Sequence, residues 1–327
     1  MAFPADRPRR LRRTAALRRL VEQTRLHPAD FVLPLFVKEG ITEQVDVTSM
    51  PGVQQHTLDS LRKVASEAVD AGVGGLILFG IPETKDATGS QADAADGIVQ
   101  VALRALRSEF GDAAVLMADL CLCEYTDHGH CGPLTTDGAT VDNDVTLMRY
   151  AAVAKAQVEA GADVVAPSGM MDGQVGVIRD AIDSAGYADR AILAYSAKYA
   201  SAFYGPFRDA AESTPSFGDR RGYQMDPANV DEALREVFAD LDQGADAVMV
   251  KPAGPYLDVI ARVSDAVDVP VSAYQVSGEY AMVEAAAEQG WIERERAIVE
   301  SVTAIRRAGA QSILTYWATE LALSLHG

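Results

Sequence analysis

The sequence predicts an α/β fold, a (β/α)₈ or TIM barrel with an extended N-terminal arm, on three observations. From residue 31 onward the chain repeats one unit, a short apolar run followed by an amphipathic stretch. There are eight such runs, and eight strands that alternate with helices can close into a parallel barrel. The chain has 327 residues, a length that one barrel of this kind often reaches.

Each predicted strand is a short apolar run of the type that is buried on both faces of a parallel sheet. The eight runs cover residues 31–37, 75–80, 115–120, 163–167, 191–195, 245–250, 269–274 and 312–317. A doubly wound open sheet is the alternative arrangement of such strands. No glycine-rich dinucleotide-binding motif follows any run, which favours the barrel.

Helices are predicted between the strands from the spacing of apolar residues. In the first helix one face is apolar, and Gly72 follows as a stop signal. The apolar residues of that face are Leu58, Leu61, Val64, Ala65, Ala68 and Val69. Residues 92–110, 144–160, 174–186, 227–243, 256–266, 280–289 and 293–308 have a similar pattern.

The first 25 residues differ in charge from the rest of the chain. They hold eight arginines against Asp6 and Glu22, a net charge of +6, whereas the whole chain carries −18 and the remainder therefore −24. We divide the chain into a basic arm, residues 1–25, and one barrel domain, residues 26–327. The arm lacks the apolar segment and the serines of targeting peptides. A nucleic-acid-binding tail is an alternative, but we expect an arm that lies on an acidic neighbouring subunit.

Two lysines stand at the carboxyl ends of predicted strands. Lys198 follows the run 191–195 and Lys251 the run 245–250, although the chain has only six lysines against 23 arginines. A lysine held against apolar walls is desolvated, which lowers its pKa. The neutral amine can then attack a carbonyl and form a Schiff base. For either lysine alone, the alternative is a side chain that reaches the surface.

The loop after the third predicted strand carries a candidate metal site. Cys121, Cys123 and Cys131 have the spacing C-x-C-x₇-C, and His128 and His130 lie inside it. Thiolates with imidazoles favour zinc, and three protein ligands leave a position open for water or substrate. The alternatives are a closed site completed by either histidine and a redox cluster without metal. The chain has no other cysteines and no disulfide framework, so we expect a reducing cytoplasm.

Polar residues gather where the predicted strands end. Because the carboxyl ends of all barrel strands lie on one face, these side chains should converge on one site. They are Asp119, Ser168, Lys198, Lys251, Tyr274 with Ser277, and Tyr316. The long polar segment 209–224 between the fifth and sixth strands suggests a lid. Its arginines could bind a carboxylate or pair with the acidic body of the protein.

Four motifs make the chain resemble the δ-aminolevulinate dehydratase (porphobilinogen synthase) family. They are Asp-Leu-Cys-Leu-Cys with His-Gly-His-Cys-Gly at 119–132, Ala-Pro-Ser-Gly-Met-Met-Asp-Gly at 166–173, Tyr-Ser-Ala-Lys-Tyr-Ala-Ser-Ala-Phe-Tyr-Gly-Pro-Phe-Arg-Asp-Ala at 195–210, and Val-Met-Val-Lys-Pro at 248–252. The resemblance covers the chain from about residue 10. It implies a lyase that condenses two δ-aminolevulinates to porphobilinogen in haem biosynthesis, through lysine Schiff bases and with zinc assistance.

The resemblance also implies a role for each candidate residue. Lys251 matches the lysine that binds the propionate-side substrate, and Lys198 matches the lysine for the acetate-side substrate. The three cysteines match the zinc ligands of the family's metal-using branch. The family's groups around the acetate-side carboxylate correspond to Arg208, Arg220 and Gln224, and those around the propionate-side carboxylate to Ser277 and Tyr316.

Three further expectations concern a proton acceptor, a second metal and the assembly. Asp119 lies beside both the metal loop and the strand ends, so we assign it as the proton acceptor. By resemblance, Glu236 falls where many bacterial members bind an allosteric magnesium, although a helix glutamate is usually only solvated. Gly169 departs from the family, in which some members carry an acid there. The family is usually an octamer whose arms embrace neighbours, which would explain the basic arm.

Other function classes fit the sequence less well. A class I aldolase shares the barrel and a Schiff-base lysine but needs only one lysine and no three-cysteine loop. A zinc-dependent structural or binding module would leave the two strand-end lysines without a purpose. A pI of about 4.6 argues against a nucleic-acid-binding body, and no apolar run is long enough to span a membrane.

Overall fold

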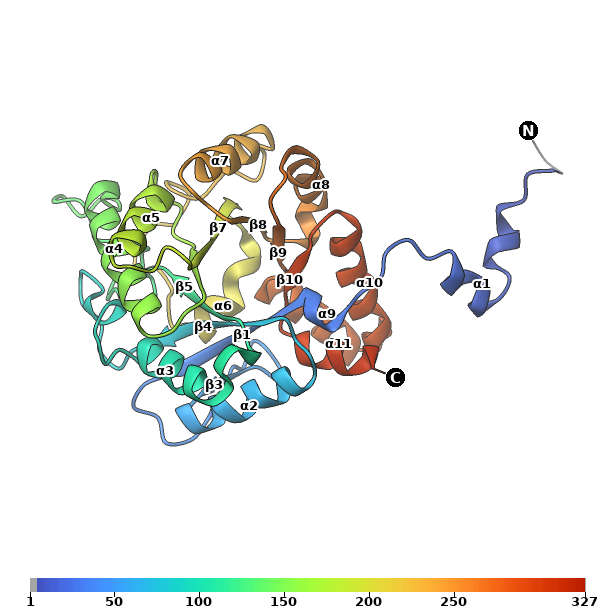
Figure 1. The fold of residues 1–327 in the computed structure, drawn as a ribbon, viewed down its shortest axis with the longest axis horizontal. Helices are drawn as coiled ribbons and strands as arrows, with labels where there is room; N and C mark the ends of the chain where they lie inside the picture. Colours follow the sequence, from blue (N-terminus) through green and yellow to red (C-terminus); the bar gives the residue numbers. More distant parts are fainter. Residues whose placement is uncertain (1–4, 327) are drawn as a thin grey trace.

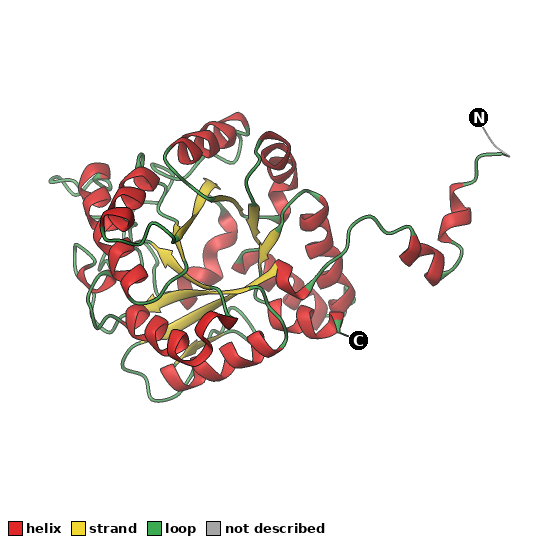
Figure 2. Cartoon of the chain, viewed as in Figure 1, coloured by secondary structure: helices red, strands yellow, loops and turns green. Residues whose placement is uncertain are grey.

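The computed structural model describes residues 5–326, which form a closed parallel barrel surrounded by helices, preceded by an arm (Figure 1, Figure 2). The barrel strands follow the order β10-β9-β8-β7-β6-β5-β4-β1, and parallel pairing of β1 with β10 closes the ring. Their bounds are β1 (Phe31–Lys38), β4 (Gly75–Ile81), β5 (Leu116–Leu120), β6 (Val164–Pro167), β7 (Ala191–Lys198), β8 (Ala247–Lys251), β9 (Val271–Tyr274) and β10 (Ser312–Leu314). The predicted barrel is confirmed, and the open sheet is wrong.

Two strands end three residues away from the predicted position. β7 continues to Lys198, beyond the predicted end at residue 195, because its last residues pair with β8. The last strand, predicted over 312–317, ends at Leu314, and Trp317 is the cap residue of the next helix, α11 (Ala318–Leu325). The short strands β2 (Val45–Asp46) and β3 (Gln54–His56) were not predicted, and β3 pairs with the end of β1 outside the barrel ring.

Helices cover the outer face of the barrel. They are α2 (Leu58–Asp70), α3 (Ile98–Phe110), α4 (Asn143–Glu159), α5 (Gln174–Ser184), α7 (Asp231–Asp242), α8 (Leu257–Ala266), α9 (Ser277–Glu288) and α10 (Arg294–Arg307). The helix predicted from residue 92 begins only after Gly97, and the one predicted from 227 begins at Asp231. α9 begins three residues earlier than predicted, because the carboxylate of Glu279 accepts a hydrogen bond from Val276 N and caps the helix start.

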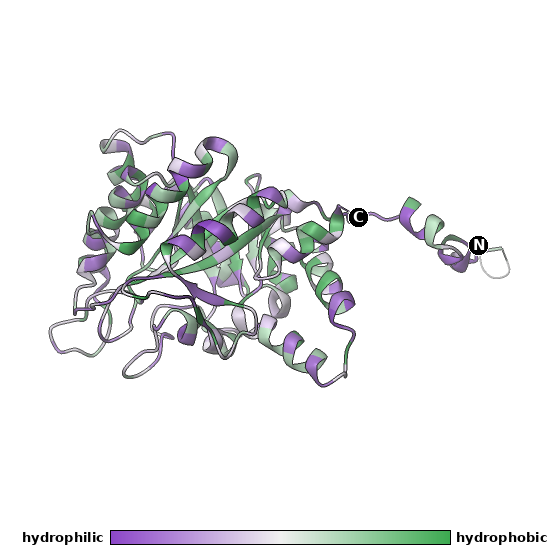
Figure 3. Ribbon diagram, turned by 90° about the horizontal axis from the view of Figure 1, so that it is seen from below, coloured by the Kyte–Doolittle hydropathy of each residue, from purple (hydrophilic) through white to green (hydrophobic). Residues whose placement is uncertain are grey.

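The core lies between the strands and the inward faces of the helices. In α2 the side chains of Leu61, Ala65 and Ala68 are buried, whereas Arg62 and Lys63 on the other face are exposed. Figure 3 shows the same division: hydrophobic residues run along the barrel strands, and the helices alternate between hydrophobic and hydrophilic residues. Each buried aliphatic side chain contributes about 1.5–3 kcal/mol, so the amphipathic pattern largely determines the helix orientation.

The described part of the arm extends away from the barrel (Figure 1). It contains the 3₁₀ helix η1 (Pro8–Arg12) and the short helix α1 (Ala15–Leu20), neither of which has a buried residue. Residues 1–4 of the predicted arm lie outside the described residues. Within residues 5–326, no helix is both long and apolar enough to cross a membrane.

Candidate active site

A continuous series of contacts joins the polar residues at the carboxyl ends of the strands. Ser168 Oγ donates to Asp119 Oδ2 at 3.1 Å, and Lys198 Nζ donates to the carbonyl oxygen of Ser168. Lys198 is the register partner of Lys251. The amine of Lys251 lies 4.3 Å from the ring centroid of Tyr274, whose hydroxyl is 3.1 Å from that of Tyr316. The structure therefore brings together the residues that the sequence expected to converge.

Lys251 projects from the end of β8 into an aromatic environment. Its residue is 5% exposed, and its amine lies 5.1 Å from the ring centroids of Tyr195 and Phe207 and 5.4 Å from that of Tyr204. Burial, reinforced by the charge of Lys198, lowers the pKa of Lys251 from 10.5 to about 7. Near neutral pH a large fraction of this amine is therefore unprotonated and can act as a nucleophile.

Asp119, the fourth residue of β5, is a buried carboxyl group between the lysines and the cysteine loop. Burial, with a further contribution from Glu124, raises the pKa of Asp119 to about 8, while the two lysines oppose the shift. Its Oδ1 atom has no hydrogen-bond partner among the described residues. A carboxyl group with such a pKa can both accept and return a proton near neutral pH.

The three cysteines form a compact buried cluster directly after β5. The sulfur atoms of Cys121, Cys123 and Cys131 all lie within 4.8 Å of one another, and those of Cys121 and Cys123 are 3.4 Å apart. Tyr150 holds the backbone of the third cysteine, since its hydroxyl donates to the carbonyl oxygen of Cys131 at 2.8 Å. Three converging thiols fit zinc, which prefers sulfur ligands in a tetrahedral arrangement. Among residues 5–326 this is the one group of three metal-ligating side chains at such spacing.

Neither histidine of the loop belongs to this cluster. His128 Nδ1 accepts a hydrogen bond from the backbone N–H of His130 at 3.2 Å. The ring nitrogens of His130 lie 3.1 Å from Tyr223 Oη and 3.1 Å from the carbonyl oxygen of Phe217. The geometry thus fits a three-cysteine site with an open position better than a site closed by a histidine.

The segment predicted as a lid packs on the cysteine loop and brings two arginines near each other. Arg208 lies in α6 (Gly205–Ala210), a helix the sequence did not predict, and Arg220 donates to the carbonyl oxygens of Gly129 and Ser213 at 2.9 and 2.7 Å. Burial, with the charge of Arg220, lowers the pKa of Arg208.

Three nitrogens of this segment and of the adjacent Arg208 have no hydrogen-bond partner among the described residues: Arg208 Nε, Arg220 Nε and Gln224 Nε2. Buried donors of this kind usually find a partner, and two guanidinium groups that repel each other favour an anion between them. The segment is therefore suited to a carboxylate.

Ser277 and Tyr316 follow the ends of β9 and β10. Ser277 Oγ accepts from the backbone N–H of Phe207 at 2.9 Å and donates to the carbonyl oxygen of Phe203 at 3.3 Å. Tyr316 follows the end of β10 and stacks at 6.3 Å, centroid to centroid, on Phe36. Ser277 thus contacts the backbone of Phe207, whose ring lies 5.1 Å from the Lys251 amine, and Tyr316 reaches the Lys251 environment through Tyr274.

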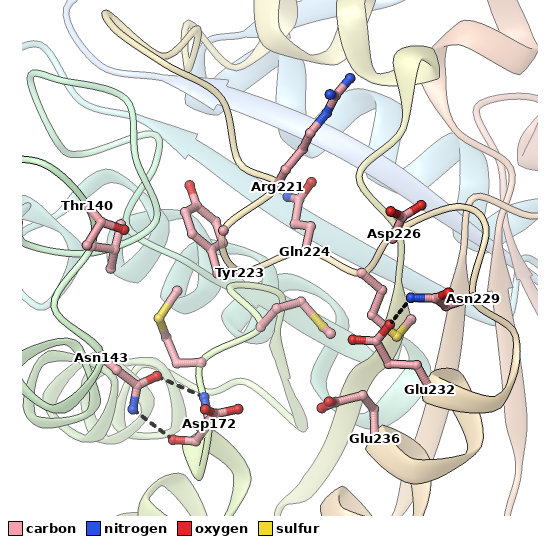
Figure 4. Close-up of a pocket in the computed structure, with 15 residues that line it drawn as sticks. Thr140, Asn143, Asp172, Arg221, Tyr223, Gln224, Asp226, Asn229, Glu232 and Glu236 are labelled. Atoms are coloured by element: carbon pink, nitrogen blue, oxygen red, sulfur yellow. Dashed lines mark hydrogen bonds between the residues drawn. The ribbon is translucent and has the colours of Figure 1, made fainter.

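Glu236 lines a separate cavity of about 410 Å³ that also reaches Gln224 (Figure 4). Glu232, one turn earlier on α7, and Asp172 line the same cavity. Burial raises the pKa of Glu236, and the negative charge of Asp172 raises it further. Glu236 is partly buried and shares its cavity with two other acids.

Gly169 has a steric explanation in this chain. A Cβ atom on this residue would stand 1.7 Å from the hydroxyl oxygen of Tyr150. An acidic side chain has no room there while Tyr150 holds the Cys131 loop.

Sequence reasoning missed Glu124, Tyr195 and Glu279. Tyr195 lies beside both lysines, and Glu124 shares the buried cysteine loop, where burial raises its pKa to about 8. Glu124 and Tyr195 lie within the motifs at 119–132 and 195–210, and this position could have identified them as candidates.

Comparisons with known proteins agree with this site. A family profile described as delta-aminolevulinic acid dehydratase matches residues 5–324. The delta-aminolevulinic acid dehydratase of Streptomyces coelicolor is 64% identical over 326 residues, covering 99% of this chain and 98% of that protein. That of Mycobacterium tuberculosis strain H37Rv is 61% identical over 323 residues, covering 98% of each chain.

A solved structure gives the same result. The chain matches delta-aminolevulinic acid dehydratase (porphobilinogen synthase) of Toxoplasma gondii ME49, in complex with the reaction product porphobilinogen, with a TM-score of 0.94 and 42% identity. The match covers 97% of this chain and 90% of that one. These similarities favour the dehydratase over the class I aldolase. The chain belongs to the delta-aminolevulinic acid dehydratase family, and it is an enzyme of that class, a lyase of porphyrin and haem biosynthesis.

Proposed function

We propose that the enzyme condenses two δ-aminolevulinates to porphobilinogen through Schiff bases on Lys251 and Lys198. The observation that carries the proposal is the register pairing of the two buried lysines, with Asp119 and the cysteine cluster beside them. The porphobilinogen bound to the Toxoplasma relative supports the same substrate class.

The neutral amine of Lys251 attacks the ketone carbon of the propionate-side substrate. The ketone oxygen leaves as water, with one proton from the amine and one taken up from solvent, and a protonated imine remains. Lys198 binds the acetate-side substrate in the same way. The positive nitrogen makes the neighbouring C–H acidic, and Asp119 accepts that proton. Holding both substrates on one site converts carbon–carbon bond formation into an intramolecular step, worth up to roughly 7–11 kcal/mol in favourable geometry.

The carboxylates of the two substrates are assigned to two different groups of residues. Arg208, Arg220 and Gln224 bind the acetate-side carboxylate, which the unpartnered nitrogens of these residues support. Ser277 and Tyr316 bind the propionate-side carboxylate. An arginine can form two parallel hydrogen bonds to a carboxylate, which fixes orientation as well as charge. Arg220 would contribute through Nε, because its Nη2 already donates to Gly129 and Ser213.

Metals are assigned to two places. Cys121, Cys123 and Cys131 hold zinc, which would polarise the second carbonyl or supply a hydroxide that takes up protons. Glu236 binds a regulatory magnesium, an ion that takes oxygen ligands, and the neighbouring acids Asp172 and Glu232 support this assignment.

The assembly is a homo-octamer in the cytoplasm, with the basic arm of one subunit lying on the acidic body of another. The arm's net charge of +6 against −24 for the rest of the chain supports the contact. Three cysteines without a disulfide are consistent with a reducing compartment.

A trapping experiment tests the residue roles. The protein is incubated with δ-aminolevulinate and borohydride, and peptide mapping by mass spectrometry locates the reduced adduct; in parallel, an aldehyde reagent detects the pyrrole product. We expect pyrrole formation and an adduct mainly on Lys251. An adduct found only on Lys198, or on neither lysine, contradicts the assignment.

A further inference from the structure

The beginning of α9 packs on the segment that leads from Lys198 to Arg208. Ser277, the first residue of α9, holds this segment through its hydrogen bonds with Phe203 and Phe207. A Cβ atom on Gly278 would stand 2.5 Å from the carbonyl oxygen of Phe203, so the helix and the segment are in direct contact. The ring of Phe207 in turn faces the amine of Lys251 at 5.1 Å.

Glu279 joins the same helix end to the loop that follows Lys251. The residue is 6% exposed, and its two carboxylate oxygens accept three backbone hydrogen bonds. Oε1 accepts from Gly254 N at 2.7 Å, and Oε2 accepts from Val276 N at 2.7 Å and from Ala253 N at 3.3 Å. One buried carboxylate therefore holds both the loop after β8 and the loop after β9.

The contact with Glu279 requires a residue without a side chain at position 254. A Cβ atom on Gly254 would stand 2.6 Å from Glu279 Oε1, closer than real Cβ contacts allow. Ala253 and Gly254 follow Lys251 after one proline, so the position of their N–H groups limits where the end of β8 can lie.

We propose that Glu279 is a positioning residue for Lys251, a role that rests on the proposed Schiff-base function. By holding Ala253 N and Gly254 N, its carboxylate keeps the end of β8 in the place from which the Lys251 amine reaches the substrate ketone. The role requires two acceptor oxygens. A glutamine has one, and its NH₂ group would face a backbone N–H donor in either orientation.

The first test is Glu279→Gln, with Glu288→Gln as the matched control on an exposed residue of the same helix. We expect Glu279→Gln to lower kcat by about 10–100-fold, because displacement of a reacting group by roughly 1 Å costs a factor of this size. KM should change less than kcat. Borohydride trapping should shift from Lys251 toward Lys198, a redistribution that a general loss of stability would not produce. Glu288→Gln should behave as the unchanged enzyme.

The second test is Gly254→Ala, which crowds the carboxylate without removing it. Gly176→Ala on α5 is the control, since its Cβ would make only ordinary contacts of 3.5 Å or more. We expect Gly254→Ala to lower kcat and Lys251 trapping as Glu279→Gln does, and the two changes together to cost less than the product of their separate effects. If Glu279→Gln does not fold, Gly254→Ala alone tests the positioning role of Glu279.

Full kcat and an unchanged Lys251 adduct in either folded variant would overturn the positioning role. The absence of any lysine adduct in the unchanged enzyme would instead contradict the proposed function, so the two failures are distinguishable.

Discussion

Lys198 and Lys251 are direct partners across two neighbouring parallel strands, and the amines of both approach the ring of Tyr195. The register pairs the two lysines, and their Nζ atoms lie 5.7 and 5.1 Å from the ring centroid. Their environments differ, because Lys198 Nζ donates to the carbonyl oxygen of Ser168 whereas Lys251 Nζ faces several aromatic rings. This asymmetry favours Lys251 as the more reactive amine.

Lys251→Met should abolish almost all turnover while raising thermal stability. Methionine keeps the length and the apolar bulk but removes the nucleophile. The pKa of Lys251 is about 7 in the folded protein, whereas a solvated lysine has a pKa of 10.5. The unfolded chain therefore binds more protons between these values, so this lysine disfavours folding increasingly as the pH falls from 10.5 to 7. Calorimetry at pH 7 and a turnover assay check both effects; Lys251→Arg should not restore turnover, because guanidinium stays protonated.

The rate of adduct trapping on Lys251 should increase as the pH rises through about 7. Only the neutral amine attacks the ketone, and the lowered pKa of Lys251 places its deprotonation in this range. The initial rate of adduct formation, measured from pH 5.5 to 9 by mass spectrometry, gives the profile. A midpoint near 10 would mean that the amine is not desolvated in solution.

Asp119→Asn should lower kcat by about 10²–10⁴-fold, the usual contribution of a general base. Asparagine keeps the size and can still accept the hydrogen bond from Ser168 but cannot take up the proton. The Lys251 adduct should still form, because attack precedes the proton transfer assigned to Asp119. Asp265→Asn on the exposed face of α8 serves as the control. Turnover within a factor of two of the unchanged enzyme would exclude the role of Asp119.

Removal of zinc by a chelator should abolish activity and leave the fold largely intact. The three thiols lie in one loop after β5, and the barrel ring is held by strand pairing that does not involve them. Elemental analysis, circular dichroism and a turnover assay are compared before and after chelation, and added zinc should restore turnover. Full activity in protein verified as metal-free would refute a working metal.

Deletion of residues 1–25 should dissociate the assembly into smaller species and lower activity without unfolding the barrel. The described arm residues extend from the barrel without burying a side chain of η1 or α1 in their own subunit. In the full-length protein, added salt should weaken the contact between arm and body, because exposed charges are screened. Light scattering measures the particle mass. An unchanged mass for the truncated protein rules this prediction out.

Most of the fold could be predicted because apolar periodicity is a local property. Eight buried runs separated by amphipathic stretches predict parallel strands, and short right-handed connections place consecutive strands side by side. The end of β7 could not be predicted in this way. Ser196 and Lys198 interrupt the apolar run, and the strand continues because Ala197 and Lys198 pair with β8. The end of a strand thus depends on pairing with a neighbouring strand that is distant in the sequence.

The candidate site divides in the same way. The sequence by itself determined the two lysines at strand ends and the three-cysteine spacing, because both follow from residue type and position along one segment. The tertiary structure decided the environment of each group. His130 meets Phe217 and Tyr223 rather than the cysteines, and Glu279 meets the loop after Lys251. Desolvation and hydrogen bonding depend on segments distant in the chain, so only the folded barrel sets the pKa of Lys251 and the partners of Glu279.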